Sequence, residues 1–130
     1  MSAQASSFAL NELGQIGLTI TDLDQAVTFY RDVLGLQHLF SAPPAMAFFA
    51  AGKIRLMLSK AEGPVAERFS CALYFKVEDI QAARDALAAR GVTFEREPQL
   101  VAKMPDHELW LAFFRDPDRN LLSLMCENRN

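Results

Sequence analysis

Mixed polar and aromatic side chains recur at alternate positions in several short runs, and these are the residues that could do chemistry. The residues at the intervening positions of each run are mostly aliphatic or aromatic. The mixed residues, run by run, are Gln15 and Thr19; Arg55, Met57 and Ser59; Tyr74 and Lys76; and Ser123, Met125 and Glu127. A face exposed only to water is more charged and contains less Met, Tyr and Ser, so the mixture favours a pocket lining. Arg55 and Lys76 would attract an anionic group such as a carboxylate, and Tyr74 could donate a hydrogen bond.

Three large aromatic residues could form walls of such a pocket. Phe48 and Phe113 hold matching places in two similar stretches, MAFFAAGK and LAFFRDPDRN, and Trp110 precedes the second stretch. Aromatic rings there would supply apolar or stacking surfaces for a ligand. Ordinary packing in the protein core is the alternative role for all three.

Hydrophobic periodicity predicts the elements that position these residues. Residues 15–20 alternate with period two, as in a strand with one covered face. Residues 23–34 carry apolar side chains at helical spacing, between a candidate N-cap at Thr21 and a terminating Gly35. The runs MAFFA and KIRLMLS then predict two strands, with room for another strand or loop around residues 36–40.

The second half of the chain repeats this order. CALYFKV predicts a strand, the helix after Asp79 ends at Gly91, and VTFERE is a further strand. A loop is expected from Pro98 to Glu108, followed by the strands LWLAFF and LLSLMCE. Because residues match at four successive elements, including ITDLDQA with VEDIQAA, the sequence predicts an internal duplication.

Length and composition suit one soluble domain. The 130 residues are 51% hydrophobic and 22% charged, with a net charge of −3, which argues against nucleic-acid binding. The longest uncharged run is too broken to span a membrane and no signal-peptide pattern is present, so we expect a cytoplasmic protein. We expect a flexible lead-in at 1–11, one domain at 12–127 with repeats 12–60 and 70–127 and a connector at 61–69, and a tail at 128–130.

Two stretches, IGLTITDLDQAVTFYRDVLGL and LAFFRDPDRNLLSLM, resemble the vicinal oxygen chelate superfamily of glyoxalases, bleomycin resistance proteins and dioxygenases. The resemblance covers residues 12–127. It implies an α+β fold of two βαβββ modules, with curved mixed sheets that enclose a cleft and helices on the outer face. It also implies a homodimer with clefts assembled from modules of both chains. Arg119 stands where members have Gly, so a positive φ there would cost roughly 1 kcal/mol and favour a reshaped turn.

The resemblance further implies a divalent cation, held by four side chains on the cleft face, that stabilises an enolate. Carried over position by position, these side chains are Gln15, Met57, Ala72 and Ser123. Gln15 is compatible with a metal, whereas Met, Ala and Ser are poor ligands for a hard cation. Three of the four positions therefore argue against the usual glyoxalase I activity.

Two functions remain open. The first is a binding module that holds a small anionic or aromatic molecule and has lost most metal positions. The second is a lyase, isomerase or dioxygenase with one Zn, Ni, Mn or Fe ion at a shifted site of Gln15, Glu127 and His107. His107 lies beside Glu108, and an ordinary loop histidine is the simpler interpretation of it. We assign no catalytic residue and expect a small molecule, but no nucleic acid or membrane, as the partner.

Overall fold

The computed structural model describes residue 8 and residues 12–42, 45–60 and 72–129. The first half contains the elements β1 (Gln15–Ile20), α2 (Leu23–Thr28), the π-helical turn η1 (Phe29–Val33), β2 (Gln37–Ala42), β3 (Met46–Ala51) and β4 (Ile54–Lys60). The second half contains β5 (Ala72–Lys76), α3 (Ile80–Ala89), β6 (Phe94–Lys103), β7 (His107–Arg115) and β8 (Leu121–Arg129). The expected connector, Asn130 and most of the expected lead-in lie outside the described residues.

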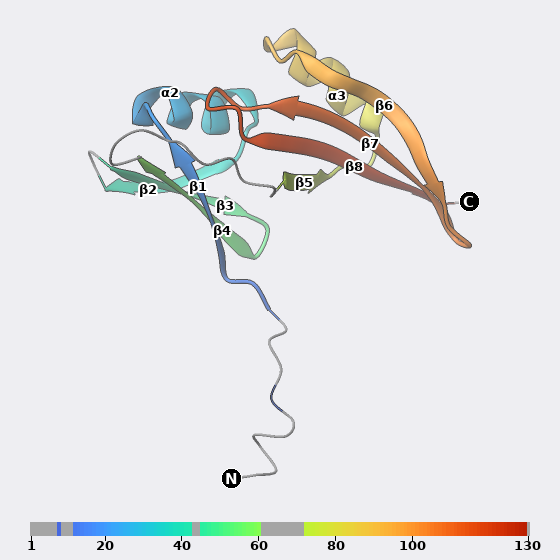
Figure 1. The fold of residues 1–130 in the computed structure, drawn as a ribbon, viewed down its shortest axis with the longest axis horizontal. Coiled ribbons are helices and arrows are strands. Elements are labelled where there is room, and N and C mark those ends of the chain that lie inside the picture. Colours follow the sequence, from blue (N-terminus) through green and yellow to red (C-terminus); the bar gives the residue numbers. More distant parts are fainter. Residues whose placement is uncertain (1–7, 9–11, 43–44, 61–71, 130) are drawn as a thin grey trace.

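Each half folds into its own four-stranded mixed sheet (Figure 1). The strand orders are β1-β4-β3-β2 and β5-β8-β7-β6, with β1 parallel to β4 and β5 parallel to β8. The two topologies are identical, which confirms the predicted pair of βαβββ modules. No strand of one sheet is hydrogen-bonded to the other sheet in the described ranges, so the two sheets do not close into a barrel.

Helices cover one face of each sheet and leave the other face open. In Figure 1, α2 lies above the first sheet and α3 above the second, so both open faces turn to the lower side. One apolar core runs through both modules. In the first module it includes Tyr30 from η1 and the sheet residues Ile20, Phe49 and Leu58, and in the second it includes Leu87 of α3 and the fully buried strand residues Ala112, Phe114 and Leu122. Burying such large apolar side chains contributes about 1.5–3 kcal/mol each.

Local sequence explains where both helices begin. Asp22, not the expected Thr21, is the N-cap of α2, and its side chain accepts a hydrogen bond from the Gln25 N–H. Asp79 caps α3 in the same way through the Ala82 N–H. Thr21 is displaced from the cap because its hydroxyl donates to Asp118 of the second module instead.

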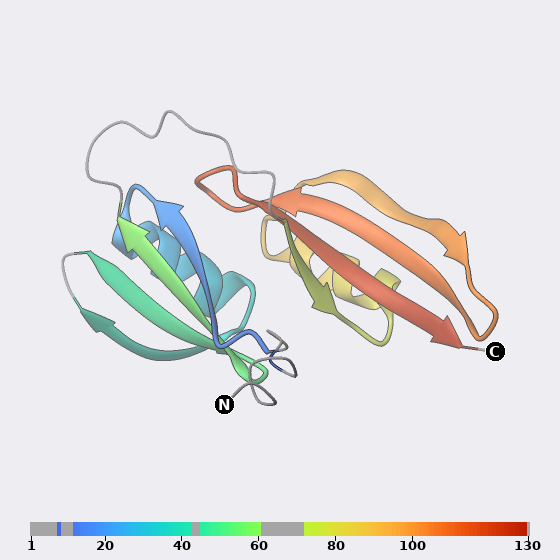
Figure 2. The same cartoon turned by 60° about the horizontal axis from the view of Figure 1, so that its bottom comes forward.

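The region expected to be a loop from Pro98 to Glu108 is mostly strand. Strand β6 runs through Pro98 to Lys103, and β7 begins at His107. Proline is tolerated because β6 is an edge strand and its pairing with β7 shifts between Arg96 and Gln99, at the position of Pro98. The resulting β6–β7 hairpin extends toward the C-terminal end of the molecule, far from the first sheet (Figures 1 and 2).

Hydrogen bonds, one of them buried, join the two modules on the helix side. The Tyr30 hydroxyl, which is fully buried, donates to Asp116 Oδ2 over 2.7 Å. Asp118 Oδ1 accepts from the Thr21 N–H at 2.9 Å and from the Thr21 hydroxyl at 2.6 Å. Burial first, and then the Asp116 carboxylate, raise the pKa of Tyr30 far above its ordinary value. We call these contacts, together with the Asn120 amide on the Thr19 carbonyl, the joint.

Arg119 lies within the loop that forms the joint. Its φ is +72°, so this residue adopts the left-handed conformation that glycine prefers. The turn is therefore not reshaped. The loop is held by its own hydrogen bonds, in which Asp116 Oδ1 accepts from the N–H groups of Asp118 and Asn120.

Candidate ligand-binding site

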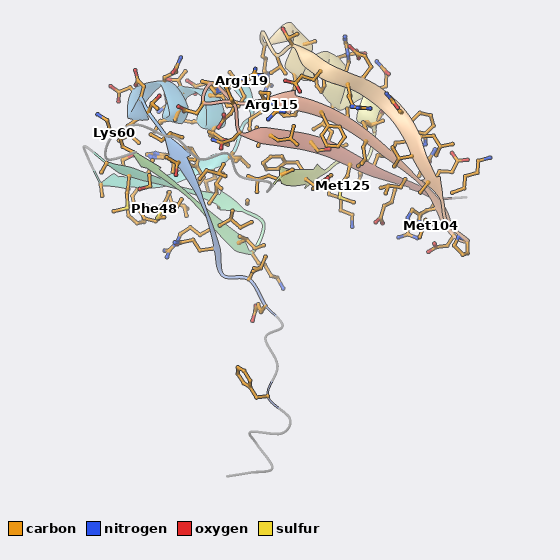
Figure 3. The ribbon with its side chains drawn as sticks, in the orientation of Figure 1. Phe48, Lys60, Met104, Arg115, Arg119 and Met125 are labelled. Atoms are coloured by element: carbon orange, nitrogen blue, oxygen red, sulfur yellow. The ribbon has the colours of Figure 1, made fainter. Side chains whose placement is uncertain are left out.

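Most predicted site residues lie on the two open faces. Along each strand these residues alternate with buried core residues, so they lie on the face that no helix covers. They are Gln15, Thr19, Phe48, Arg55 and Met57 of the first sheet, and Tyr74, Lys76, Phe113, Ser123 and Glu127 of the second. Figure 3 shows Phe48 below the first sheet, on the side away from α2. The alternation in the sequence therefore separates the helix-covered face from the open face correctly for these strands.

A layered cluster of side chains stands on the open face of the first sheet. Arg55 Nε donates to Gln15 Oε1 over 2.8 Å, and Arg55 Cζ lies 5.1 Å from the centre of the Phe48 ring. The ring of Phe40 stacks on Phe48 with centroids 4.5 Å apart and an interplanar angle of 24°. Gln15 Nε2 also donates to the Met57 sulfur over 3.7 Å. We call Phe40, Phe48 and Arg55 the aromatic–arginine stack.

Register explains why these residues meet. Gln15 is paired with Arg55 across the parallel strands, and Phe48 is paired with Met57 on one side and Phe40 on the other. The sequence prediction did not include Phe40, because residues 36–40 were assigned only to a strand or a loop.

The guanidinium of Arg55 is available for a ligand. It is exposed, and within the described ranges it makes no ion pair with a carboxylate. Gln15 and Phe48 hold its side chain in place, which lowers the conformational entropy lost when an anion binds. A planar guanidinium presents paired N–H donors that match a carboxylate.

Equivalent positions in the second sheet are engaged differently. Tyr74 is 51% exposed and meets Phe113 edge to face, with ring centroids 6.0 Å apart. Ser123 is fully buried, and its hydroxyl donates to the Ala112 carbonyl over 2.8 Å. Tyr74 and Phe113 can therefore contact a ligand, whereas Ser123 serves the packing of its own sheet.

Trp110 lies on the helix-covered face of the second sheet. It shares the alternation of Ala112 and Phe114, which are buried, and packs against the core. Its indole N–H donates to Glu108 Oε1 over 3.4 Å. The structure thus gives Trp110 the core role that the sequence left as an alternative.

The three candidates for a shifted metal site are not brought together. Gln15 is held by Arg55 in the first sheet. Glu127 and His107 lie near the C-terminal end of the second sheet, where Arg129 pairs with Glu127 at 2.9 Å and with Asp106 at 2.6 Å. The Asp106 carboxylate also accepts from His107 Nδ1 at 2.8 Å, and first His107 and then Arg129 lower the pKa of Asp106.

The four positions that the resemblance assigns to a metal do not fit one in this chain. The Gln15 amide oxygen accepts from Arg55, Met57 offers a thioether, Ala72 offers a methyl group, and the Ser123 hydroxyl donates to a carbonyl. Among the described residues, no three His, Cys, Asp or Glu side chains gather closely enough to hold a metal ion. Hard divalent cations need several oxygen or imidazole donors, so no catalytic step through a metal follows from this donor set.

Comparisons with known proteins agree with the fold. A family model described as the Glyoxalase/Bleomycin resistance protein/Dioxygenase superfamily matches residues 12–124. The uncharacterized protein YraH of Bacillus subtilis (strain 168) is 31% identical over 131 residues, which cover 87% of this chain and 96% of YraH. No helix in the described residues is long and apolar enough to cross a membrane.

Two solved structures illustrate the range of proteins with this fold. Lactoylglutathione lyase from Agrobacterium tumefaciens superposes with a TM-score of 0.69 and 22% identity, over 89% of this chain and 93% of its own. The antibiotic-binding protein TnmS3 from Streptomyces sp. CB03234 superposes with a TM-score of 0.71 and 22% identity, over 95% of this chain and 99% of its own. At these identities the superpositions show a shared fold.

Proposed function

Because the chain belongs to the Glyoxalase/Bleomycin resistance protein/Dioxygenase superfamily, we propose that it binds a small anionic aromatic molecule on its open faces without a metal ion. The observation that carries this proposal is the aromatic–arginine stack of Phe40, Phe48 and Arg55. A pair of stacked rings, of which Phe40 is exposed, beside a preorganised guanidinium is suited to a planar ligand that carries a carboxylate.

The ligand would use the stack in two ways. Its ring would lie against Phe40, which is 48% exposed, and its carboxylate would accept hydrogen bonds from Arg55. Aromatic pairing contributes about 0.5–1.5 kcal/mol beyond apolar burial, and a hydrogen bond to a charged group contributes about 1.5–3 kcal/mol. Tyr74 and Phe113 form a separate aromatic pair on the open face of the second sheet. The antibiotic-binding neighbour supports a binding role for this fold.

We infer a homodimer as the working form, in keeping with the family, and a cytoplasmic location remains our expectation. Light scattering coupled to gel filtration would report the mass directly. The alternative, a metal-dependent lyase, isomerase or dioxygenase, would require Gln15 to leave Arg55 and join donors held in the other sheet. No contact among the described residues favours that rearrangement.

The test is titration with 2-naphthoate, followed by its fluorescence or by amide chemical shifts. We expect Arg55→Ala to weaken 2-naphthoate binding at least ten-fold, since it removes a charged hydrogen-bond donor, and to leave the melting temperature unchanged. The neutral analogue 2-naphthalenemethanol should bind wild type and Arg55→Ala equally. Arg31→Ala is the matched control, because Arg31 is an exposed arginine of η1 on the other side of the sheet.

Two outcomes would contradict the proposal. One is wild-type affinity of Arg55→Ala for 2-naphthoate, which would make Arg55 irrelevant to the ligand. The other is purified protein that contains stoichiometric Zn, Ni, Mn or Fe and melts at a lower temperature after chelation, which would favour the metal-dependent alternative.

A further inference from the structure

An apolar crevice lies between the two modules, and the binding of an aromatic anion on the open faces does not use it. Figure 2 shows β1 and β5 at the edges of the two sheets that face each other. A hollow of about 470 Å³ between them is lined by Ile16, Leu36, Ala51, Gly52, Ile54, Leu56 and residues 72–76. A second hollow of about 230 Å³ lies against α3. Leu36 and Phe75 line both hollows, which therefore adjoin.

The walls of the crevice are core-type side chains that neither module covers completely. Leu36, Phe75 and Val77 pack against the buried cores, yet each remains partly exposed. Two small residues of α3, Ala83 and Ala86, line the second hollow, so the helix leaves space there. The first hollow alone, and the two taken together, have the size of small-molecule sites, which measure roughly 300–1,000 Å³.

The charges along the crevice have one sign. Its charged lining residues are Lys76 in the first hollow and Arg90 in the second, and no Asp or Glu lines either hollow in the described part of the chain. This is unexpected in a chain with a net charge of −3. Arg90 Nη1 donates to the Val33 carbonyl over 2.9 Å, whereas Lys76 makes no ion pair with a described residue. An apolar channel with cations along it suits an amphipathic anion.

We propose that this crevice is a second ligand site, for a linear aliphatic molecule with one carboxylate. The chain lies against Leu36 and Phe75 and extends toward Ala86, and the carboxylate lies at Lys76. The lining residues of β1 and β4, Ile16 and Leu56, belong to the helix-covered face, and Lys76 reaches the crevice from the edge strand β5, whereas Arg55 points to the open face and lines neither hollow. The two sites therefore bind different classes of molecule independently.

The first experiment is a calorimetric titration of the full-length protein with octanoate, decanoate and dodecanoate, below the concentrations at which they form micelles. Affinity should rise about fifteen-fold for each added pair of methylene groups, which corresponds to about four-fold for each buried methylene. Lys76→Gln should weaken decanoate binding up to about five-fold, as for an exposed ion pair, and leave 1-decanol binding unchanged. Affinity that does not depend on chain length would overturn the proposal.

A filling variant tests the position of the chain. Ala86 is an exposed position of α3, so Ala86→Phe should fold normally while its ring occupies the second hollow. We expect it to abolish the gain in affinity between decanoate and dodecanoate. Ala89→Phe is the control, because Ala89 is exposed on the same helix and lines neither hollow.

The remaining outcomes separate this site from the others. Arg55→Ala should bind dodecanoate as wild type does, even if it fails to bind 2-naphthoate. Wild-type dodecanoate binding by Ala86→Phe would overturn the proposal. So would a change from dimer to monomer caused by Ala86→Phe in light scattering, since that would identify the crevice as a contact between two copies of the chain.

Discussion

The two modules have the same topology but use their equivalent positions in different ways. In the first module, the Phe48 ring lies on the open face against the Arg55 guanidinium and stacks with the exposed ring of Phe40. In the second module, the buried hydroxyl of Ser123 hydrogen-bonds to the backbone of its own sheet.

The loop between β7 and β8 also differs, because it reaches the first module through Asp116 and Asp118, whereas its counterpart between β3 and β4 is a short turn at Gly52. A repeated backbone therefore does not repeat its chemistry. The first module exposes the aromatic–arginine stack on its open face, and the second module supplies the loop that forms the joint with Tyr30 and Thr21.

The largest expected effect concerns the joint at high pH. Tyr30 must stay protonated to donate to Asp116, and burial raises its pKa. Stability from this group is complete below the unfolded-state pKa of about 10 and is lost as pH rises above it, because the unfolded state then releases a proton that the folded state keeps. The free energy of unfolding should fall by about 2.3 kcal/mol from this group between pH 10 and 12.

Urea denaturation across this pH range measures the loss. Tyr30→Phe should be less stable at pH 8 but should decline less steeply above pH 10. Tyr74→Phe is the control, since Tyr74 is the other tyrosine of the chain and is half-exposed. Parallel pH profiles for wild type and Tyr30→Phe would show that the joint does not depend on this proton.

A smaller effect is expected at the second open face. Ser123→Ala removes a buried hydrogen bond to the Ala112 carbonyl and should lower the free energy of unfolding by about 1 kcal/mol. It should leave 2-naphthoate binding unchanged, in contrast to Arg55→Ala, which should change binding and leave stability unchanged. If Ser123→Ala weakened binding without destabilising the protein, the division of roles between the modules would be wrong.

The smallest expected effects come from substitutions in the β3–β4 turn and in the β7–β8 turn. Gly52 has a φ of +64° and Arg119 a φ of +72°, so both turns need the left-handed conformation. This conformation costs a non-glycine residue about 1–2 kcal/mol, and the greater entropy of unfolded glycine offsets about 0.5–1 kcal/mol. Arg119→Gly should therefore stabilise the protein by about 0.5–1 kcal/mol, measured by thermal melting.

Gly52→Ala should have the opposite sign and a similar size. A Cβ at Gly52 would meet no atom within 4 Å, so the backbone conformation alone determines the cost. A loss of stability on Arg119→Gly would instead mean that the hydrogen bond from the Arg119 side chain to Glu95 outweighs the strain.

Strand alternation predicted much of the fold and one face of the site. It placed Gln15 and Arg55 on the mixed face because period two assigns each side chain to a face even when the strand order is unknown, whereas Phe48 was identified from the internal repeat. Their contacts depend on register, which pairs Gln15 with Arg55 and was not predictable from a single strand. Phe40 was missed because its strand follows a helix without a clear alternating pattern of its own.

Residues at strand ends and bulges were harder to predict. The pairing shifts around Pro98 turn an expected loop into an edge strand, and they depend on partners in β7 rather than on local sequence. Arg129, two residues beyond the last predicted strand, forms ion pairs with Glu127 and Asp106, so the Glu127 carboxylate that was predicted as a metal ligand is already engaged. Long-range ion pairs of this kind leave no periodic signal in the sequence.

The position of the joint affects how this protein can change during evolution or engineering. Tyr30, Asp116 and Asp118 make their bonds in the loops and helix layer, not on the open faces. Mutations at Phe48, Arg55 or their neighbours therefore do not remove any bond between the modules. Substitutions on the open face of the first sheet can therefore change ligand preference, in evolution or in a mutant library, while the joint keeps the two sheets in the same relative position.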